Sequence, residues 1–363
     1  MKKIAYIELD THAEIAQNVM ELMKDSNVFK VDYYFSEKII KQIKNNESTI
    51  FFSENTELLN QLSQHKYDLV IIGTVHRYFN LFKEITEKYN TSIIVHNLNF
   101  TRISKVQLFK SIFLKDFAYR VKLLFKENLL SAPKVFKNAK NLLVLDESIV
   151  DFDFSPTHSN TTFLKYFPLF FNQFNVKNNS KIFAIVIPGA VSQQRRDYNK
   201  VISIISDLEK SIKSGFNFNE KIIEFVFLGK AKGNELKKII DLERSLEIIN
   251  IKYFTEKVPQ KLFDEWMNKA DFLWCPIQEK TAFFSNQEFY GKTKMSGNIG
   301  DAIKYGKLAL FPENYQTDHQ FLVSSEKDMK SQFQKMDKVY FDFQLGNNKD
   351  YVLKKLEKIL NDL

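Results

Sequence analysis

The residues best suited to chemistry lie in a stretch rich in glycine and lysine, residues 291–301. If Asp301 opens a helix, the turn before it presents backbone amides at the positive end of the helix dipole, and such a turn attracts anions. Lysines beside the turn would add positive charge. Phosphate is expected to be bound by the turn of Ser296, Gly297, Asn298 and Gly300 and by Lys292 or Lys294, while Asp301 is expected to cap the helix or to contact the rest of the ligand. The alternative is an ordinary glycine-rich turn with solvated lysines.

A second candidate phosphate contact follows the apolar run at residues 182–187. Gly189 lets the backbone approach a ligand closely, and the guanidinium groups of Arg195 and Arg196 match the oxygens of a phosphate. We expect at least one of these arginines to contact phosphate. The alternative is an exposed helix start in which one arginine pairs with the neighbouring aspartate. Further along the chain, the backbone near Val258 is a candidate contact for a nucleobase.

Histidines that follow predicted strands of the first half are candidate proton acceptors. His12, together with Asp10, comes directly after the first predicted strand and is the leading candidate for a general base that takes a proton from a hydroxyl group. His76 and His96 also end predicted strands and are the alternatives. A different reading is that Asp10 and Thr11 begin a helix and that the histidine beside them is incidental.

These candidate residues need a framework, and each half of the sequence supplies one. Short apolar runs separated by polar, helix-like stretches predict a parallel sheet covered on both faces. The predicted strands are residues 4–7, 31–34, 68–73, 92–95 and 142–145 in the first half, and residues 182–187, 223–229, 249–254, 272–274 and 308–311 in the second. Because ligands of such sheets bind at the carboxyl ends of the strands, the loops after these strands should carry the function.

The length of 363 residues favours two domains over one. The polar stretch at residues 172–180 has no hydrophobic periodicity, so the boundary is expected there. We therefore predict an N-terminal domain at residues 1–172 and a C-terminal domain at residues 173–363. The last helix, at residues 351–363, is expected to pack back onto the first domain.

Composition indicates a globular protein of a reducing compartment. Hydrophobic residues make up 44% of the chain, and the only cysteine, Cys275, lies in an apolar run, as a buried thiol does. The 52 Lys and Arg against 44 Asp and Glu favour anionic partners. Neither zinc-ligand spacing nor an RNA-binding pattern is present, so we expect no metal site and no nucleic-acid partner. Without a signal-peptide pattern or a membrane-spanning run, the protein is expected in the cytoplasm.

Residues 106–140 combine apolar side chains at helical spacing with lysines and arginines on the flanks. Such a helix suits the surface of an anionic membrane, where it would make the protein a peripheral membrane protein. A helix packed on the core with a solvated back gives the same pattern.

Taken together, these patterns resemble the glycosyltransferases of the GT-B fold. The likeness rests on the tandem α/β halves, the Gly189–Arg195–Arg196 loop, a strand ending in FLG, a loop ending in VP at Val258, and K-x-S-G-x-x-x-D-A-I-x-x-G-K before a strand. It covers most of the second half, and the first half matches only in its alternation of strands and helices. The resemblance implies two tandem Rossmann-like, doubly wound α/β domains that face a cleft.

The resemblance also implies roles for the second half. In this family the second domain binds a nucleotide-diphosphate sugar, and an acidic residue at the position of Asp301 commonly binds the ribose. Many members that retain the anomeric configuration carry a glutamate eight positions earlier, where this chain has Thr293. Glu288 is near but out of register, so the sequence leaves open whether transfer inverts or retains the configuration.

The function expected from these residues is transfer of a sugar from a nucleotide-diphosphate donor to an acceptor hydroxyl group, without a cofactor or a metal. By resemblance, the acceptor is a glycan or a lipid-linked molecule in the synthesis of surface polysaccharide or glycoconjugate. A sugar-nucleotide epimerase of similar two-domain form is one alternative. A non-catalytic protein that binds nucleotide sugars is another.

Overall fold

The computed structural model describes residues 1–44, 49–114, 116–150, 163–174, 181–218 and 221–363. The chain forms two compact units. Unit 1 consists of Met1–Phe170, Ala282–Met295 and Lys349–Leu363, and unit 2 consists of Phe171–Thr281 and Ser296–Asn348. The predicted division at residues 172 and 173 therefore needs a correction, because a segment from deep in the second half belongs to unit 1. Residues 175–180 of the predicted boundary lie outside the described residues.

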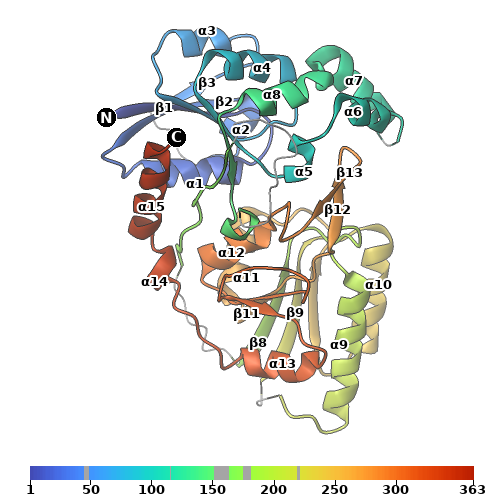
Figure 1. Cartoon of the computed structure of the whole chain (residues 1–363). Helices are drawn as coiled ribbons and strands as arrows, with labels where there is room; N and C mark the ends of the chain where they lie inside the picture. Colours follow the sequence, from blue (N-terminus) through green and yellow to red (C-terminus); the bar gives the residue numbers. More distant parts are fainter. Residues whose placement is uncertain (45–48, 115, 151–162, 175–180, 219–220) are drawn as a thin grey trace. The chain divides into compact units, whose positions relative to one another are not determined.

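Unit 1 is built on a seven-stranded sheet in the order β3-β2-β1-β4-β5-β6-β7, with every neighbouring pair parallel (Figure 1). Its central strands are buried along their whole length, which is why they read as continuous apolar runs. The strands are β1 (Lys2–Glu8), β2 (Phe29–Phe35), β3 (Ile50–Phe52), β4 (Leu69–Ile72), β5 (Thr91–Ile94), β6 (Asn141–Val144) and β7 (Phe163–Tyr166).

Unit 2 repeats the arrangement with a six-stranded sheet in the order β10-β9-β8-β11-β14-β15, again parallel throughout. In both units the first strand pairs with the second and with the fourth, which is the strand order of dinucleotide-binding folds. The strands are β8 (Ile182–Pro188), β9 (Ile222–Lys230), β10 (Asn250–Phe254), β11 (Phe272–Trp274), β14 (Ala309–Phe311) and β15 (Leu322–Ser324).

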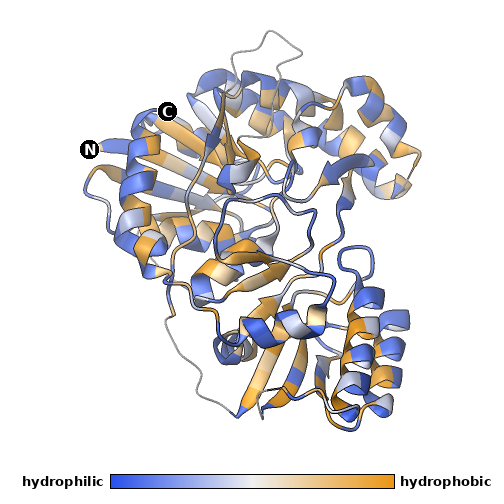
Figure 2. Ribbon diagram, turned by 60° about the horizontal axis from the view of Figure 1, so that its bottom comes forward, coloured by the Kyte–Doolittle hydropathy of each residue, from blue (hydrophilic) through white to orange (hydrophobic). Residues whose placement is uncertain are grey.

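The helices bury one face and expose the other, as Figure 2 shows by hydropathy. In α9, for example, the buried residues Tyr198, Val201, Ile205 and Leu208 recur every three or four positions. The helices of unit 1 are α1 (Ala13–Met23), α2 (Glu37–Ile40), α3 (Leu58–Ser63), α4 (Phe79–Lys88), α5 (Leu98–Thr101), α6 (Lys105–Ile112), α7 (Phe117–Glu127), η1 (Leu129–Ser131), α8 (Ala132–Asn138), η2 (Glu147–Ile149) and α15 (Lys349–Asn361). Those of unit 2 are α9 (Tyr198–Lys213), α10 (Gly233–Ser245), α11 (Gln260–Lys269), α12 (Gly297–Tyr305), α13 (Met329–Met336) and α14 (Gln344–Asn347).

The helical pattern predicted over residues 106–140 is divided among several short helices instead of one. Helices α6 and α7 are separate elements, and η1 and α8 follow them. Arg120, which the sequence placed on a basic flank, is only 5% exposed. Its guanidinium donates to the carbonyl of Ser111 and, over 2.8 Å, to Oγ of Ser285. Lys115, another residue of that flank, lies outside the described residues.

The segment Ala282–Met295 reaches unit 1 as part of a hairpin formed by β12 (Lys280–Phe283) and β13 (Asn286–Phe289). Phe284 and Ser285 form its turn, and both have positive φ, as a two-residue turn that matches strand twist requires. Burial offsets the strain of this conformation, since Phe284 packs in the unit 1 core against Phe100. The hairpin is thus held by the core of unit 1 and not by its sequence neighbours.

The described part of the chain contains no helix with both the length and the apolar character needed to cross a membrane. Helix α15 packs within unit 1, where Lys349 pairs with Asp25 over 2.5 Å and Glu357 accepts a hydrogen bond from Ser26 over 2.6 Å.

Candidate functional site

Three histidines gather at the carboxyl edge of the unit 1 sheet. His12 follows β1, His76 follows β4 and His96 follows β5. The rings of His12 and His96 are stacked, with centroids 3.8 Å apart and planes 15° from parallel. The ring of His76 lies 6.2 Å from His12 and 6.3 Å from His96. The structure therefore brings together all three imidazoles that the sequence offered as alternatives.

The local environment separates the three imidazoles chemically. Burial, with the positive charges of His12 and Lys294, lowers the pKa of His76 to about 3. Burial also lowers the pKa of His96, and its Nε2 lies 3.1 Å from the carbonyl oxygen of Gly73, so this nitrogen carries the proton. Both rings are neutral at physiological pH and are weak bases. They also line a cavity of only about 10 Å³, too small for a sugar.

His12 differs from its neighbours because a carboxylate orients it. Its Nδ1 lies 2.9 Å from Oε1 of Glu14, whose side chain is 70% exposed. A carboxylate at Nδ1 favours the tautomer that carries its proton there and leaves the lone pair on Nε2. His12 also has a left-handed backbone (φ 59°), an uncommon conformation for a residue other than glycine. The arrangement of a base held by a second group is the one used to activate a hydroxyl.

Asp10, the other predicted catalytic residue, is engaged elsewhere. Its Oδ1 pairs with Nζ of Lys38 over 3.2 Å and with Nη1 of Arg77 over 3.6 Å. Arg77 in turn donates to Oε1 of Glu127 in α7 over 2.8 Å. Because both ion pairs engage Oδ1 of Asp10, the geometry favours His12 over Asp10 as the base.

Two glutamates near the histidines have contacts or burial that the sequence alone did not reveal. Glu14 stands in the first turn of α1 and looked like an ordinary acidic helix start. Glu8 ends β1 and looked like the polar boundary of an apolar strand, yet it is 1% exposed and burial raises its pKa to about 7. The sequence could have pointed to Glu8 only through its position, as a charged residue at the carboxyl end of a buried strand.

The glycine- and lysine-rich stretch is divided between the two units. Residues through Met295 belong to unit 1 and those from Ser296 onward belong to unit 2. Nζ of Lys294 donates to Oδ1 of Asn97 over 2.5 Å and lies 3.5 Å from the carbonyl oxygen of His96. Lys294 is thus placed in the histidine cluster of unit 1, and Lys292 also lies in unit 1. The expectation that one of these lysines contacts phosphate remains untested.

Helix α12 begins earlier than the sequence suggested, so the expectation that Asp301 opens or caps the helix is wrong. The helix spans Gly297–Tyr305, and Ser296 caps it by accepting a hydrogen bond from the backbone N–H of Asn298. Gly300 and Asp301 lie inside the helix instead of in the preceding turn or at its start. The glycines suggested a turn, but the serine cap and the apolar positions Ile299, Ala302 and Ile303 favour a helix.

A polar cradle surrounds Asn298 in unit 2. Asn298 is buried, and its Oδ1 accepts a hydrogen bond of 3.0 Å from Nη2 of Arg196. Its Nδ2 donates to the carbonyl of Pro188 over 3.4 Å and to Oδ2 of Asp301 over 3.2 Å. Asn298 therefore connects the end of β8, the arginine loop and the first turns of α12.

Glycine is required at two positions of this cradle. Gly189 has φ +100°, and a Cβ there would lie 2.4 Å from Nη2 of Arg196. A Cβ at Gly229 would lie 2.2 Å from the carbonyl oxygen of Gly189. Gly189, Gly229 and Arg196 are therefore in close contact, and the guanidinium of Arg196 lies against the backbone at Gly189. Within the described part of the chain, the buried Nε of Arg196 has no hydrogen-bond acceptor, so it can donate to an anion.

The remaining predicted donor-binding residues lie outside this cradle or have structural roles. The side chain of Arg195 is exposed, and Val258 is half-exposed just before Pro259, the N-cap of α11. Asp197, the possible partner of the arginines, instead caps α9 through the N–H of Lys200. The predicted burial of Cys275 is confirmed, and burial raises the pKa of its thiol.

Glu288 and Thr293, the residues at or near the position where retaining glycosyltransferases carry a glutamate, have structural roles. Glu288 is fully buried and accepts hydrogen bonds from the backbone N–H groups of Asn99 and Phe100, over 3.2 and 2.9 Å. Oγ1 of Thr293 accepts from the N–H of Phe289 over 2.8 Å. Both residues fix the hairpin segment within unit 1.

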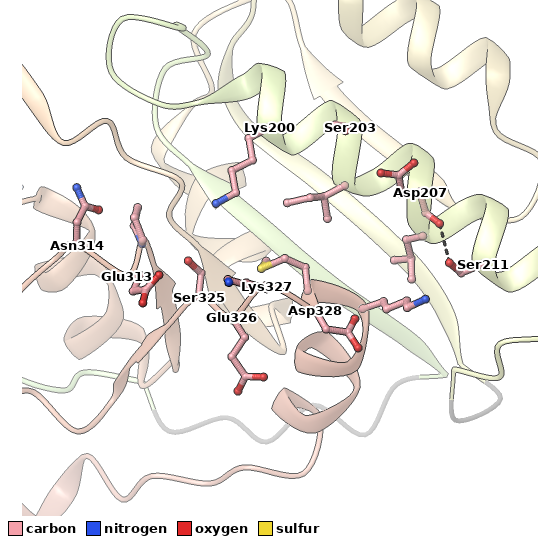
Figure 3. A pocket seen from close by; sticks show the side chains of 15 residues that line it. Lys200, Ser203, Asp207, Ser211, Glu313, Asn314, Ser325, Glu326, Lys327 and Asp328 are labelled. Atoms are coloured by element: carbon pink, nitrogen blue, oxygen red, sulfur yellow. Dashed lines mark hydrogen bonds between the residues drawn. The ribbon is translucent and has the colours of Figure 1, made fainter.

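A pocket of about 770 Å³ in unit 2 lies away from all these residues (Figure 3). It runs along α9 from Lys200 to Ser211 and is closed by the loops after β14 and β15. Among its acidic residues, Asp328 caps α13 and Glu326 pairs with Lys335 over 3.3 Å. Because the cradle at Asn298 lies at the carboxyl ends of the unit 2 strands, where ligands of such sheets bind, it is the candidate anion site. No group of three or more candidate metal ligands occurs among the described residues.

Comparison with known proteins gives the fold a name. No protein family model matches the chain, and no curated protein matches it. Among solved structures, trehalose-6-phosphate synthase OtsA aligns with a TM-score of 0.55 and 8% identity over 100% of this chain and 99% of that one. The lipopolysaccharide outer core galactosyltransferase WaaB aligns with a TM-score of 0.54 and 12% identity over 99% and 100%.

A UDP-GlcNAc 2-epimerase from Neisseria meningitidis, solved with UDP-GlcNAc, also aligns, with a TM-score of 0.51 and 12% identity over 99% of this chain and 100% of that one. At such identities the likeness shows the fold alone. The chain has the GT-B fold of nucleotide-sugar glycosyltransferases, and the predicted α/β class with two Rossmann-like domains is confirmed.

The cradle generates a prediction for nucleotide binding. Replacing Arg196 with alanine should weaken binding of UDP about 10- to 100-fold, because a hydrogen-bonded charge contributes roughly 1.5–3 kcal/mol. Isothermal titration calorimetry with UDP, ADP and GDP measures the effect. Arg195→Ala is the matched comparison, because its exposed side chain should contribute less. Equal losses in the two variants would contradict the assignment of Arg196 to the site.

The neutral histidines generate a prediction for stability. Because the folded-state pKa of His76 is about 3, below its unfolded value near 6.5, unfolding takes up a proton in this window and stability falls as pH drops from about 6.5. In His76→Phe, the fall in the free energy of unfolding should be smaller by up to about 1.4 kcal/mol for each pH unit. Urea unfolding at several pH values between 7.5 and 4.5 tests it. The exposed His65, replaced by glutamine, should leave the slope unchanged.

Proposed function

We propose that the protein is a glycosyltransferase that moves a sugar from a nucleotide-diphosphate donor to an acceptor hydroxyl group. The observation that carries the proposal is the cradle of Arg196 and Asn298 at the carboxyl edge of the unit 2 sheet, in a chain with the GT-B fold. The neighbours solved with UDP-2-fluoro glucose and UDP-GlcNAc support a nucleotide sugar as the donor class.

In this proposal the cradle stabilises the leaving diphosphate. Negative charge grows on the oxygen that departs from the anomeric carbon, and the guanidinium of Arg196 and the amides at the start of α12 offset that charge without reorganising. Asp301, held by Asn298, would accept a hydrogen bond from the ribose. The backbone near Val258 would contact the base. With charge offset by the protein, the step needs no metal ion.

Unit 1 would supply the base. Nε2 of His12 takes the proton of the acceptor hydroxyl while the oxygen forms its bond to the anomeric carbon and the bond to the diphosphate breaks. The proton therefore ends on the imidazole, and Glu14 at Nδ1 stabilises the imidazolium. Direct attack of this kind inverts the anomeric configuration. Thr293 in place of the glutamate of retaining members is consistent with it.

A sugar-nucleotide epimerase is the second candidate, and one observation favours it. The epimerase from Neisseria meningitidis shares the fold, and the buried carboxyl group of Glu8 near the histidines offers a second acid-base group. Incubation with the donor alone separates the candidates. An epimerase changes the configuration of the sugar without an acceptor, whereas a transferase consumes the donor quickly only when an acceptor is present.

The first experiment is a thermal-shift screen of UDP-, GDP-, ADP- and dTDP-sugars. A ligand at about 100 times its dissociation constant stabilises by roughly 2.7 kcal/mol. Hits are then tested for turnover with hydroxyl acceptors and, separately, without any acceptor. Binding without turnover in either assay would support the non-catalytic nucleotide-sugar-binding protein instead. No stabilisation by any nucleotide or sugar would overturn the whole proposal.

We further propose an acceptor at the inner face of the cell membrane, either a glycan or a lipid-linked molecule of surface polysaccharide synthesis. The support comes from α6 and α7 and the residues between them, where large apolar side chains are exposed. They include Val106, Phe109, Phe113, Leu114, Phe117, Tyr119 and Phe125, the last 81% exposed. Phe109, Phe113 and Phe117 form a ladder, with centroids 5.6 and 5.9 Å apart.

The charge around this apolar surface favours an anionic bilayer. The same two helices carry the exposed side chains of Lys105, Lys110, Lys122 and Lys126, whereas Glu127 of α7 is buried and paired with Arg77. A protein surface of this kind binds a bilayer because its apolar side chains insert between the lipids and its lysines attract the anionic headgroups. This surface belongs to unit 1, the unit that carries the proposed base.

His12→Ala tests the base. Turnover should fall about a hundred- to ten-thousand-fold while donor affinity stays the same, because the imidazole acts on the acceptor in the transition state. Glu14→Gln should lower turnover less, since the imidazole remains. Near-normal turnover of His12→Ala, or a product with retained configuration, would contradict this role.

Replacing Phe109, Phe113 and Phe117 together with serine tests the membrane surface. Vesicle sedimentation should show at least about tenfold weaker binding to phosphatidylglycerol–phosphatidylcholine vesicles, because three apolar anchors are lost. Binding of the unchanged protein should weaken with salt and be lower on pure phosphatidylcholine. Tyr340→Ser, at an exposed aromatic residue of unit 2, is the control. Equal binding of the triple variant would exclude the ladder.

A further inference from the structure

The carboxyl group of Glu8 lies where the two loops that carry the histidines meet. Its Oε1 accepts the backbone N–H groups of Asp10 and Thr11, both over 3.2 Å. Its Oε2 accepts the hydroxyl of Thr74 over 2.7 Å. One buried side chain therefore holds both the loop after β1, which leads into His12, and the loop after β4.

The same side chain limits the shape of the second loop. A Cβ at Gly73 would lie 2.6 Å from Oε2 of Glu8 and 2.8 Å from the hydroxyl of Tyr6, so only glycine fits there. The carbonyl of Gly73 in turn receives Nε2 of His96 over 3.1 Å. Glu8 is thus connected through Thr74 and Gly73 to the ring that stacks on His12.

The backbone of His12 needs such a support. Its left-handed conformation is costly for a residue with a side chain, and it persists only where neighbouring contacts fix it. The two N–H groups that Glu8 binds are those of the residues just before His12. We propose that Glu8 is a positioning residue for the proposed proton transfer, because its carboxylate fixes the His12 loop and the stacked His12–His96 pair.

The charge state of Glu8 connects this role to pH. Burial raises its pKa to about 7, while the hydrogen bond from Thr74, those from the N–H groups of Asp10 and Thr11, and the charge of His12 act in the opposite direction. The titratable groups that face it are Tyr6 on its own strand and His12 on the following loop. The carboxylate, present above about pH 7, accepts all three hydrogen bonds, whereas the protonated acid must use one oxygen as a donor.

The inference rests on the proposed function, so its experiment includes a measurement that needs no turnover. The imidazole NMR signal of His96, whose ring stays neutral because of burial, should show a step near pH 7 in the full chain that reports Glu8. Glu8→Gln, which keeps the shape but cannot ionise, should remove this step. With donor and acceptor, Glu8→Gln should lower kcat at pH 8 about 10- to 100-fold at unchanged donor KM, as loss of an orienting partner does.

Thr74→Val gives an independent test of the sign. Because the hydroxyl of Thr74 lowers the pKa of Glu8, its loss should move the NMR step to higher pH. Glu209→Gln is the matched control, since Glu209 is a buried carboxylate that accepts backbone N–H groups in unit 2. A step unchanged in both Glu8→Gln and Thr74→Val would overturn the proposal. If the protein shows no turnover at all, the NMR step still decides the role of Glu8.

Discussion

The parallel pairing of β1 with β4 and of β8 with β11 determines where chemistry can occur in each unit. In this strand order the connections leave the centre of the sheet in opposite directions, so the loops after the first and fourth strands are not covered by a crossover. Unit 1 places His12 and His76 on those two loops. Unit 2 places Gly189 and Cys275 at the corresponding strand ends, beside Asn298 of α12. The same constraint therefore gathers histidines at the strand ends of one unit and the polar side chains around Asn298 at those of the other.

The strands at the sheet centres were predictable because burial on both faces gives a continuous apolar run. The short strands at the edges of the two sheets were not predicted. The strands β3, β7 and β15 are three or four residues long and partly exposed, so their apolar runs are too short to identify a strand. The hairpin at Ala282–Met295 escaped for another reason. Its membership of unit 1 depends on Phe284 packing against the core and on Glu288 binding the N–H groups of α5, and neither contact has a local sequence signal.

The candidate sites show the same division between local and tertiary information. The loops that carry His12, Gly189 and Arg196 were predictable, because strand ends can be located from the sequence. The role of each side chain was less so. Lys307, the last residue of the K-x-S-G-x-x-x-D-A-I-x-x-G-K motif, donates to the carbonyls of Asn268 and Ala270 over 2.8 and 2.5 Å. It therefore binds the carboxyl end of α11, and burial lowers its pKa to about 8.

The charges around His12 explain how a histidine cluster can contain a base. An imidazolium formed beside the ammonium of Lys294 would be disfavoured, and the same charge helps to keep His76 neutral. The carboxylates of Glu14 and Glu8 act in the opposite direction, since Glu14 hydrogen-bonds Nδ1 of His12 and the positive charge of His12 lowers the pKa of Glu8. His76 and His96 have no such carboxylate among their pKa-shifting neighbours in the described chain. Of the three imidazoles, His12 is therefore the one whose ring is hydrogen-bonded to a carboxylate, that of Glu14.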